Sequence, residues 1–220
     1  MKVRLDEQTI ALRAAREFED GSVVNLGYGM PALCANLIPE GKAVFLQSEN
    51  GVLGFGPLAT DEEKDYELIN ASDQPVTPLP GMCFFDSAVS FDMIRGGHIG
   101  VVVLGAYQVS ERGDLANWGR PGRPATGMGG GMDLAVGAKK VIVTMLHTTK
   151  EGEPRIVKEC SFPFTAKECV NMIVTDLAVI EVTRRGLVLR EVAPGWTVEE
   201  VQILTEPELA VAPDLKEITL

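Results

Sequence analysis

The chain has 220 residues and a net charge of −11, from 20 Lys and Arg against 31 Asp and Glu. Its hydrophobic content of 45% and charged content of 23% are those of a globular protein, which excludes the disordered and fibrous classes. An acidic surface repels phosphate backbones, so general binding of nucleic acid is not expected. The length suits one domain, and we expect a single domain over residues 1–220.

Neither a membrane segment nor a metal site is expected from the sequence. The best apolar run, residues 101–104, is far shorter than the ~20 residues of a membrane span. Residues 1–7 lack an apolar core and contain early acids, unlike a secretory signal, so we expect a cytoplasmic protein. The four cysteines and two histidines do not have the spacing of metal ligands.

The first part of the chain alternates predicted helices with predicted strands. The pattern predicts a helix from an Asp6 cap to about residue 18, a strand over 22–26, a helix over 32–38 that follows Pro31, and a strand over 43–47. Helices and strands that alternate with short connections are typical of a parallel sheet covered by helices.

The middle of the chain contains two segments that are expected to be irregular. Residues 50–85 hold the turn pair Asn50-Gly51 and several prolines, and residues 105–131 are rich in glycine. Long loops in compact domains are usually functional or mobile. The remaining pattern predicts a helix over 86–94, a strand over 99–104, a short helix over 132–138 and a strand over 140–146.

The last third has an antiparallel pattern. Strands are predicted over 177–183 and 187–191 around a turn that contains Gly186. Thr197 and Glu200 have the spacing of a capping box, so a short helix should follow. The predicted fold class is therefore α/β, with a mostly parallel sheet covered by helices and an antiparallel extension, in a single domain.

A glycine pattern near the start of the chain allows two interpretations. Gly27, Gly29 and Ala32 form G-x-G-x-x-A between a predicted strand and a predicted helix, and Glu49 follows Gly29 by 20 residues. This spacing predicts an NAD(P)-binding oxidoreductase. However, Glu49 directly precedes a tight turn, which would present its carboxylate in a crevice at the carboxyl end of the sheet. A second glycine cluster, at 127–131, favours a site around the Glu49 carboxylate over a dinucleotide site. Tight turns alone would also explain either glycine cluster.

The run Ser48-Glu49-Asn50-Gly51 resembles the active-site signature of the β subunit of class I CoA-transferases. Further segments resemble the same family in the expected order, so the resemblance covers roughly residues 8 to 205. These segments are 25–31, 79–81, 90–98, 113–118, 127–134 and 160–170. The chain differs from the usual family pattern at Gly131, where alanine is common, and at Tyr28, where an aliphatic residue is common.

The resemblance implies a covalent mechanism and assigns the site residues. Glu49 would be the catalytic nucleophile, and a glutamyl-CoA thioester would form on it. The backbone N–H groups of Gly129 and Gly130 would stabilise the oxyanion. The expected substrate and CoA contacts are Asn25, Gly27, Gly29, Gln47 and Asn50. No metal or organic cofactor is implied, because CoA is itself a substrate.

The function implied by the resemblance is the transfer of CoA from an acyl-CoA, such as succinyl-CoA, to a short 3-oxo acid such as acetoacetate or 3-oxoadipate. Family members of this type pair with an α subunit, which predicts an αβ or α2β2 enzyme. Three alternatives stay open at this point. They are an acyl-CoA hydrolase on the same scaffold, an NAD(P)-binding oxidoreductase, and a binding or regulatory subunit without activity.

Overall fold

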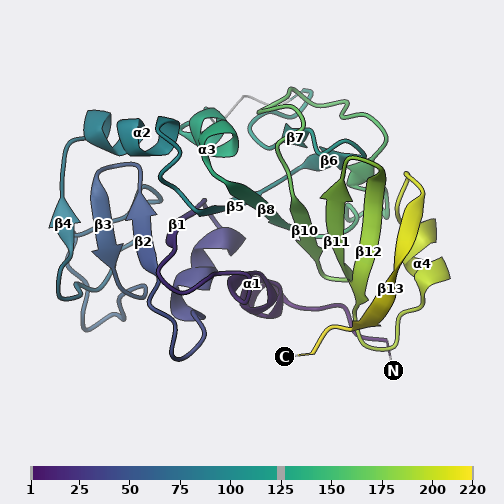
Figure 1. The fold of residues 1–220 in the computed structure, drawn as a ribbon, viewed down its shortest axis with the longest axis horizontal. Helices are drawn as coiled ribbons and strands as arrows, with labels where there is room; N and C mark the ends of the chain where they lie inside the picture. Colours follow the sequence, from purple (N-terminus) through teal and green to yellow (C-terminus); the bar gives the residue numbers. More distant parts are fainter. Residues whose placement is uncertain (1, 123–126, 220) are drawn as a thin grey trace.

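The computed structural model describes residues 2–122 and 127–219. Its main feature is a 10-stranded sheet with the strand order β13-β12-β11-β10-β8-β5-β1-β2-β3-β4 (Figure 1). The five adjacent strands from β10 to β2 all run parallel to one another. Antiparallel strands flank them on both sides, and β13 at one edge runs parallel to β12. The predicted class, a mostly parallel α/β sheet with an antiparallel extension, is confirmed.

The strands and helices have the following bounds. The strands of the large sheet are β1 (Val23–Leu26), β2 (Phe45–Ser48), β3 (Val52–Phe55), β4 (Cys83–Phe84), β5 (Val101–Gly105), β8 (Lys140–Met145), β10 (Met172–Thr175), β11 (Ala178–Thr183), β12 (Gly186–Val192) and β13 (Leu209–Glu217). The helices are α1 (Glu7–Ala15), the 3₁₀-helix η1 (Met30–Asn36), α2 (Ser87–Arg95), α3 (Gly131–Gly137) and α4 (Val198–Ile203).

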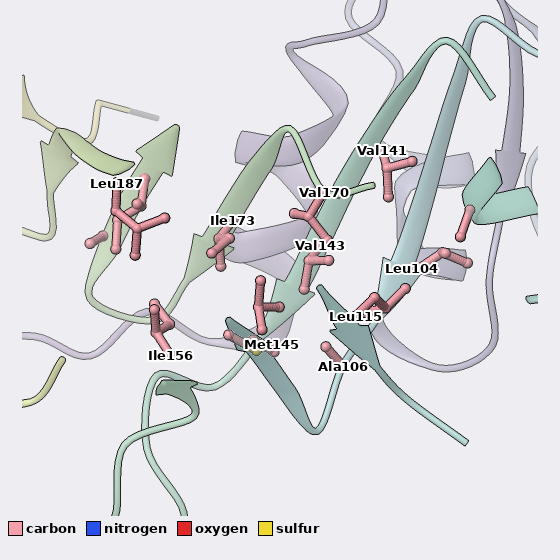
Figure 2. Packing of buried hydrophobic residues seen from close by; sticks show 14 of the residues in the cluster. Leu104, Ala106, Leu115, Val141, Val143, Met145, Ile156, Val170, Ile173 and Leu187 are labelled. Atoms are coloured by element: carbon pink, nitrogen blue, oxygen red, sulfur yellow. The ribbon is translucent and has the colours of Figure 1, made fainter. Parts of the chain in front are cut away.

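Each face of the large sheet has its own hydrophobic core. Successive residues of a strand point to opposite faces, so Val103 packs with α1 and η1, whereas Val102 packs with α2 and α3. The second core also takes in the three-stranded sheet of β6 (Gln108–Ser110), β7 (Leu115–Ala116) and β9 (Ile156–Val157). Figure 2 shows Leu115 and Ile156 of the small sheet facing Val143 and Ile173 of the large one. The near-continuous apolar strands of the sequence are explained by this two-sided burial.

Local signals in the sequence predicted the starts of α1, α2 and α4 correctly. The Asp6 and Asp86 side chains accept hydrogen bonds from the backbone N–H groups of Thr9 and Val89, at 2.7 and 3.0 Å. The capping box of Thr197 and Glu200 is present at α4. The hairpin of β11 and β12 is confirmed as well.

Other details differ from the prediction. The helix expected over 32–38 is a 3₁₀-helix that begins at Met30, and the first helix ends at Ala15. The segments expected to be irregular contain β3, β4, β6 and β7, while β10 and β13 were not predicted. Part of the glycine-rich segment, residues 123–126, lies outside the described residues. Within the described residues, no helix is long and apolar enough to cross a membrane.

His147 links the end of the parallel sheet to the C-terminal part of the chain. It is fully buried, and its ring nitrogens each lie 2.9 Å from a threonine hydroxyl, those of Thr175 and Thr205. Burial lowers the pKa of the imidazole to about 4, so the ring is neutral at pH 7. The neutral ring therefore bridges the end of β10 and the segment after α4.

This burial predicts a pH dependence of stability. Between pH 6.5 and about 4 the unfolded chain binds a proton at His147 that the folded chain does not, so stability falls as the pH is lowered. The contribution is on the order of 3 kcal/mol across this window. Urea unfolding at pH 7, 6 and 5 should show a steeper loss for the native sequence than for His147→Gln. The exposed His98 provides the control, because His98→Gln should keep the native slope. Equal slopes in all three proteins would contradict the assignment.

Candidate active site

Glu49 lies in the tight turn that joins β2 to β3. The backbone N–H of Gly51 donates to the Ser48 carbonyl at 3.0 Å and closes this turn, and the two strands pair antiparallel. Because β2 belongs to the parallel group, the turn stands at the carboxyl edge of these strands, where open α/β sheets usually bind ligands. The Glu49 side chain is half-buried, so its carboxylate is held at the surface of the sheet edge.

Asn25, near the end of the neighbouring strand β1, is a contact of the Glu49 carboxylate. Asn25 is fully buried and pairs with Gln47 in the parallel register. Its amide nitrogen Nδ2 lies 3.2 Å from Oε2 of Glu49 and 2.7 Å from Oε1 of Gln47, and it donates to both. Its other atom, Oδ1, is buried and has no hydrogen-bond partner within the described part of the chain. An N–H donor therefore faces the carboxylate from the sheet side.

A chain of hydrogen bonds fixes which end of the Asn25 amide faces Glu49. The Ser90 hydroxyl lies 3.3 Å from the backbone carbonyl of Ser48, which can only accept, so this hydroxyl donates there and accepts from Nε2 of Gln47 at 2.7 Å. The oxygen of the Gln47 amide then faces Asn25. Only the nitrogen of the Asn25 amide can satisfy that oxygen, and the same nitrogen meets Glu49.

Gly130, directly before α3, lies near Oε1 of Glu49, the carboxylate oxygen that Asn25 does not contact. A Cβ placed on Gly130 would lie 3.4 Å from Oε1 of Glu49 and 3.2 Å from the ring of Phe91. A methyl group at Gly130 would thus be in ordinary contact with the carboxylate and in tighter contact with the Phe91 ring, so Gly130 is a direct neighbour of Glu49. Within the described ranges the N–H of Gly130 makes no hydrogen bond, to Glu49 or to another residue.

The structure therefore gathers four of the predicted site residues, Asn25, Gln47, Glu49 and Gly130. The Gln47 side chain is 1% exposed, and its amide is engaged by Asn25 and Ser90. Gln47 therefore contacts Asn25 and holds its amide in place, and Asn25 in turn contacts the Glu49 carboxylate.

The other four predicted residues lie in the loops around this group. The N–H of Gly27 donates to Val103 at 2.8 Å, and Gly29 is an exposed residue directly before η1. Asn50 donates its side-chain amide to the carbonyl of Ile69 at 2.8 Å, which is a turn-stabilising contact. Gly129 is exposed beside Gly130. None of these four has a hydrogen bond to Glu49 among the described residues.

The geometry favours the carboxylate interpretation of the first glycine pattern over the dinucleotide one. The segment after Gly29 forms a seven-residue 3₁₀-helix, whereas the dinucleotide fingerprint requires an α-helix whose N-terminus faces the pyrophosphate. Glu49 meets Asn25 and the Gly130 backbone at the sheet edge. Within the described ranges, no three His, Cys, Asp or Glu side chains come together as a metal site.

Sequence reasoning gave no role to Ser90 and Phe91, although both shape the surroundings of Glu49. Ser90 and Ile94 are the two buried residues of α2, and they are four positions apart on one face of the helix. A serine on the buried face of an amphipathic helix needs a polar partner. The position of Ser90 on that face was therefore the signal in the sequence for a buried hydrogen bond at this residue. The partner itself could not be predicted, because Gln47 is 43 residues away in the sequence.

Comparison with known proteins decides the family. The family model described as Coenzyme A transferase matches residues 7–203, which is most of the chain. This chain belongs to the coenzyme A transferase family. The resemblance that the sequence motifs indicated is thereby confirmed over nearly its full expected length.

Two proteins that are similar to this chain differ in how much of their own length the match covers. One subunit of a probable succinyl-CoA:3-ketoacid coenzyme A transferase from Bacillus subtilis is 50% identical over 91% of this chain and 93% of its own length. The mitochondrial succinyl-CoA:3-ketoacid coenzyme A transferase 2 of Homo sapiens is 52% identical over 94% of this chain. The match spans only 40% of that human protein, so the chain corresponds to less than half of it.

Solved structures of this family share the fold. An acyl-CoA transferase apoenzyme from Escherichia coli O157:H7 superposes with a TM-score of 0.75 and 21% identity, covering 100% of this chain and 45% of that one. Glutaconate coenzyme A-transferase from Acidaminococcus fermentans gives a TM-score of 0.72 at 14% identity, covering 100% of this chain and 91% of that one. At these identities the agreement concerns the fold alone.

Proposed function

We propose that this chain is the catalytic β subunit of a CoA-transferase that moves CoA from an acyl-CoA to a short carboxylic acid. The observation that carries the proposal is the Glu49 carboxylate, which stands on a tight turn with the Asn25 amide 3.2 Å from one of its oxygens. The Gly130 backbone lies close to the other oxygen. A carboxylate with the Asn25 N–H donor at one oxygen and a glycine next to the other suits acyl chemistry on that carboxylate.

The proposed reaction proceeds through covalent intermediates on Glu49. The carboxylate attacks the thioester carbonyl of the acyl-CoA, and CoA leaves as a thiolate, which gives a mixed anhydride. The thiolate then attacks the Glu49 carbonyl carbon, which releases the free acid and leaves a glutamyl-CoA thioester. An acceptor carboxylate reverses both steps. Each step exchanges one acyl bond for another, so the route needs CoA only as a substrate and no metal or organic cofactor.

Negative charge develops on an oxygen in each of the two attacks and again when the acceptor reverses them, and the site has an N–H donor for this charge. Each attack passes through a tetrahedral oxyanion, and that on the Glu49 carbon forms where Asn25 Nδ2 already contacts the carboxylate. A preorganised N–H donor at such a position typically contributes ~10²–10³ in rate. The hydrogen bonds from Gln47 and Ser90 keep the donor end of the Asn25 amide in place before the reaction starts.

Substrate and partner are the finer parts of the proposal. The names of the Bacillus and human relatives support succinyl-CoA as the donor and a 3-ketoacid as the acceptor. A third relative, from Acinetobacter baylyi, is named a 3-oxoadipate CoA-transferase subunit, which supports 3-oxoadipate beside acetoacetate as the acceptors to test. The Bacillus relative is named as one subunit of its enzyme, and the human relative is more than twice as long as the matched segment. Both facts support an α subunit that completes the enzyme as αβ or α2β2. We propose a cytoplasmic location, as expected from the sequence.

The decisive experiment is the intact mass of this chain, purified with its α subunit, after addition of succinyl-CoA without an acceptor acid. We expect an adduct with the mass of CoA less one water, localised to Glu49 and removed by hydroxylamine. Steady consumption of acyl-CoA without an adduct would instead support an acyl-CoA hydrolase. A verified complex with neither an adduct nor turnover would overturn the covalent mechanism.

The hydrogen-bond chain behind Asn25 makes a separate prediction. Ser90→Ala removes the hydroxyl that orients Gln47, so the Asn25 amide loses its fixed direction. We expect kcat to fall about tenfold with KM nearly unchanged, because only the transition-state donor is disturbed. Ser90→Thr should restore the rate. Ser87→Ala, on the exposed side of the same helix, is the matched control and should have no effect. Equal rates for Ser90→Ala and Ser87→Ala would contradict the role.

A further inference from the structure

Helices α2 and α3 pack against each other, side by side (Figure 1). A Cβ on Gly137, the last residue of α3, would clash with the backbone carbonyl oxygen of Ile94 in α2, so the two helices meet this closely only with a glycine there. At the other end of α3, a Cβ on Gly130 would lie 3.2 Å from Cζ of Phe91. The packing of the two helices therefore places the Phe91 ring directly against the start of α3.

The Phe91 ring and the Glu49 carboxylate are neighbours of the same glycine. A Cβ on Gly130 would lie 3.2 Å from Cζ and 3.4 Å from Cε1 of the ring, and 3.4 Å from Oε1 of Glu49. Phe91 is half-buried, and it packs against the hydrophobic core that α2 and α3 share. The outer edge of the ring, which carries Cζ and Cε1, is therefore the part that lies beside Gly130, close to the carboxylate.

An arginine connects the Phe91 ring to the start of α3. The guanidinium of Arg95, one helical turn after Phe91 in α2, lies over the ring at 5.2 Å from its centroid. Nε of Arg95 also donates to Oδ1 of Asp133, in the first turn of α3, at 2.8 Å. Because Arg95 is exposed, each of these contacts is weak alone. Together they favour the one orientation in which the ring stays against Gly130.

Both intermediates of the proposed reaction, the mixed anhydride and the glutamyl-CoA thioester, can be destroyed by water. Attack of water on the Glu49 carbonyl carbon of the thioester breaks the C–S bond, releases CoA as the free thiol, and regenerates the Glu49 carboxylate with loss of one proton. The enzyme would then hydrolyse acyl-CoA instead of passing CoA to an acceptor acid, so transfer requires that water be kept away from this carbon. A phenylalanine ring has no hydrogen-bonding atom that could hold a water molecule there.

We infer that Phe91 is a specificity-determining residue, whose ring shields the intermediates on Glu49 from water and so favours transfer over hydrolysis. The observation that carries the inference is the position of the ring edge beside Gly130 and Oε1 of Glu49. The hydrogen bond from Asn25 assists attack on the Glu49 carbon by either nucleophile, whereas the ring distinguishes water from an acceptor acid. The inference rests on the proposed function, because the shielded intermediates belong to that route.

The test measures how long the CoA adduct on Glu49 survives in water. The complex of this chain with its α subunit is loaded with succinyl-CoA and separated quickly from free substrate and succinate, and the adduct is followed by intact mass without an acceptor. Phe91→Ala should shorten its lifetime about tenfold and raise the acceptor-free consumption of succinyl-CoA by about the same factor. Transfer to acetoacetate should not become faster. A general distortion of the site would instead slow both reactions.

Three further variants make the test specific to the outer edge of the ring. Phe91→Met keeps an apolar side chain of similar reach and should keep nearly the native lifetime. Phe91→Leu is too short to replace the edge beside Gly130, so its lifetime should lie between those of Phe91→Met and Phe91→Ala. Tyr66→Ala is the matched control, because Tyr66 is an aromatic residue that is 76% exposed, and its adduct should last as long as the native one.

The outcomes separate this inference from the proposed function. The inference is overturned if the adduct of Phe91→Ala lasts as long as the native one, or if Tyr66→Ala shortens the lifetime equally. Should Phe91→Ala not fold, equal lifetimes for Phe91→Leu and Phe91→Met would overturn it. In all of these cases the native complex still forms the adduct, so the proposed function stands. A native complex that forms no adduct would overturn the proposed function, and this inference with it.

Discussion

Replacing Glu49 by glutamine should reduce CoA transfer by at least about 10⁴-fold while the protein remains folded. The expected loss is large because an amide cannot replace the nucleophilic carboxylate at the start of the covalent route. Folding should survive because Glu49 is only half-buried, and the amide oxygen introduced by Glu49→Gln can still accept from Asn25 at its present 3.2 Å. The measurements are the transfer rate of the αβ complex and its melting temperature.

Glu49→Asp tests whether position matters as much as charge. It keeps the carboxylate but withdraws it by about one methylene from the Asn25 amide and the Gly130 backbone. A misplacement of ~1 Å can cost about a hundredfold, so this variant should fall between the native enzyme and Glu49→Gln. Replacing Glu63, a carboxylate in an exposed segment, by glutamine should leave the rate unchanged. Transfer by Glu49→Gln at more than about a tenth of the native rate would exclude Glu49 as the nucleophile.

The parts of the fold that the sequence predicted are those fixed by local chemistry. Asp6, Asp86 and Thr197 each cap a helix through a contact within three residues, so the signal lies in a short window. A helix was also expected directly after Pro31; the structure has a 3₁₀-helix there, which begins at Met30 and includes Pro31. Such positions depend little on the rest of the molecule.

The parts that were missed depend on contacts that are distant in the sequence. The strand β13 contains Pro213 and several charges, which disfavour a strand, and it forms because it pairs with β12 at the edge of the sheet. The Gln47–Ser90 contact in the site likewise requires α2 to pack on β2. The motif around Glu49 indicated the residue, whereas the direction of the amides around it comes only from tertiary structure.

The turn that carries Glu49 yields the second large effect, because Gly51 cannot carry a side chain. Its φ is 112°, in the region that favours glycine, and a Cβ there would lie 1.9 Å from the backbone carbonyl oxygen of Phe85. Phe85 is itself bound to Gly51 by a backbone hydrogen bond of 2.9 Å, so the two segments cannot separate without losing it. We expect Gly51→Ala to lower the free energy of unfolding by about 3 kcal/mol or more, as strained φ and a backbone clash add.

The measurement is urea unfolding of Gly51→Ala beside Gly105→Ala, which is the matched control. A Cβ on Gly105 would meet nothing within 4 Å, so that variant should be nearly as stable as the native chain. Equal stability of the two variants would show that the turn relaxes more easily than its geometry indicates.

Transfer activity separates a loss of stability from a displacement of Glu49, the two consequences of the clash. If the turn shifts by even ~1 Å to accept the methyl group, Glu49 moves with it, and the rate should fall about a hundredfold at temperatures where the variant is still folded. The glycine of the Ser48–Gly51 turn is thus required by the backbone that presents the carboxylate.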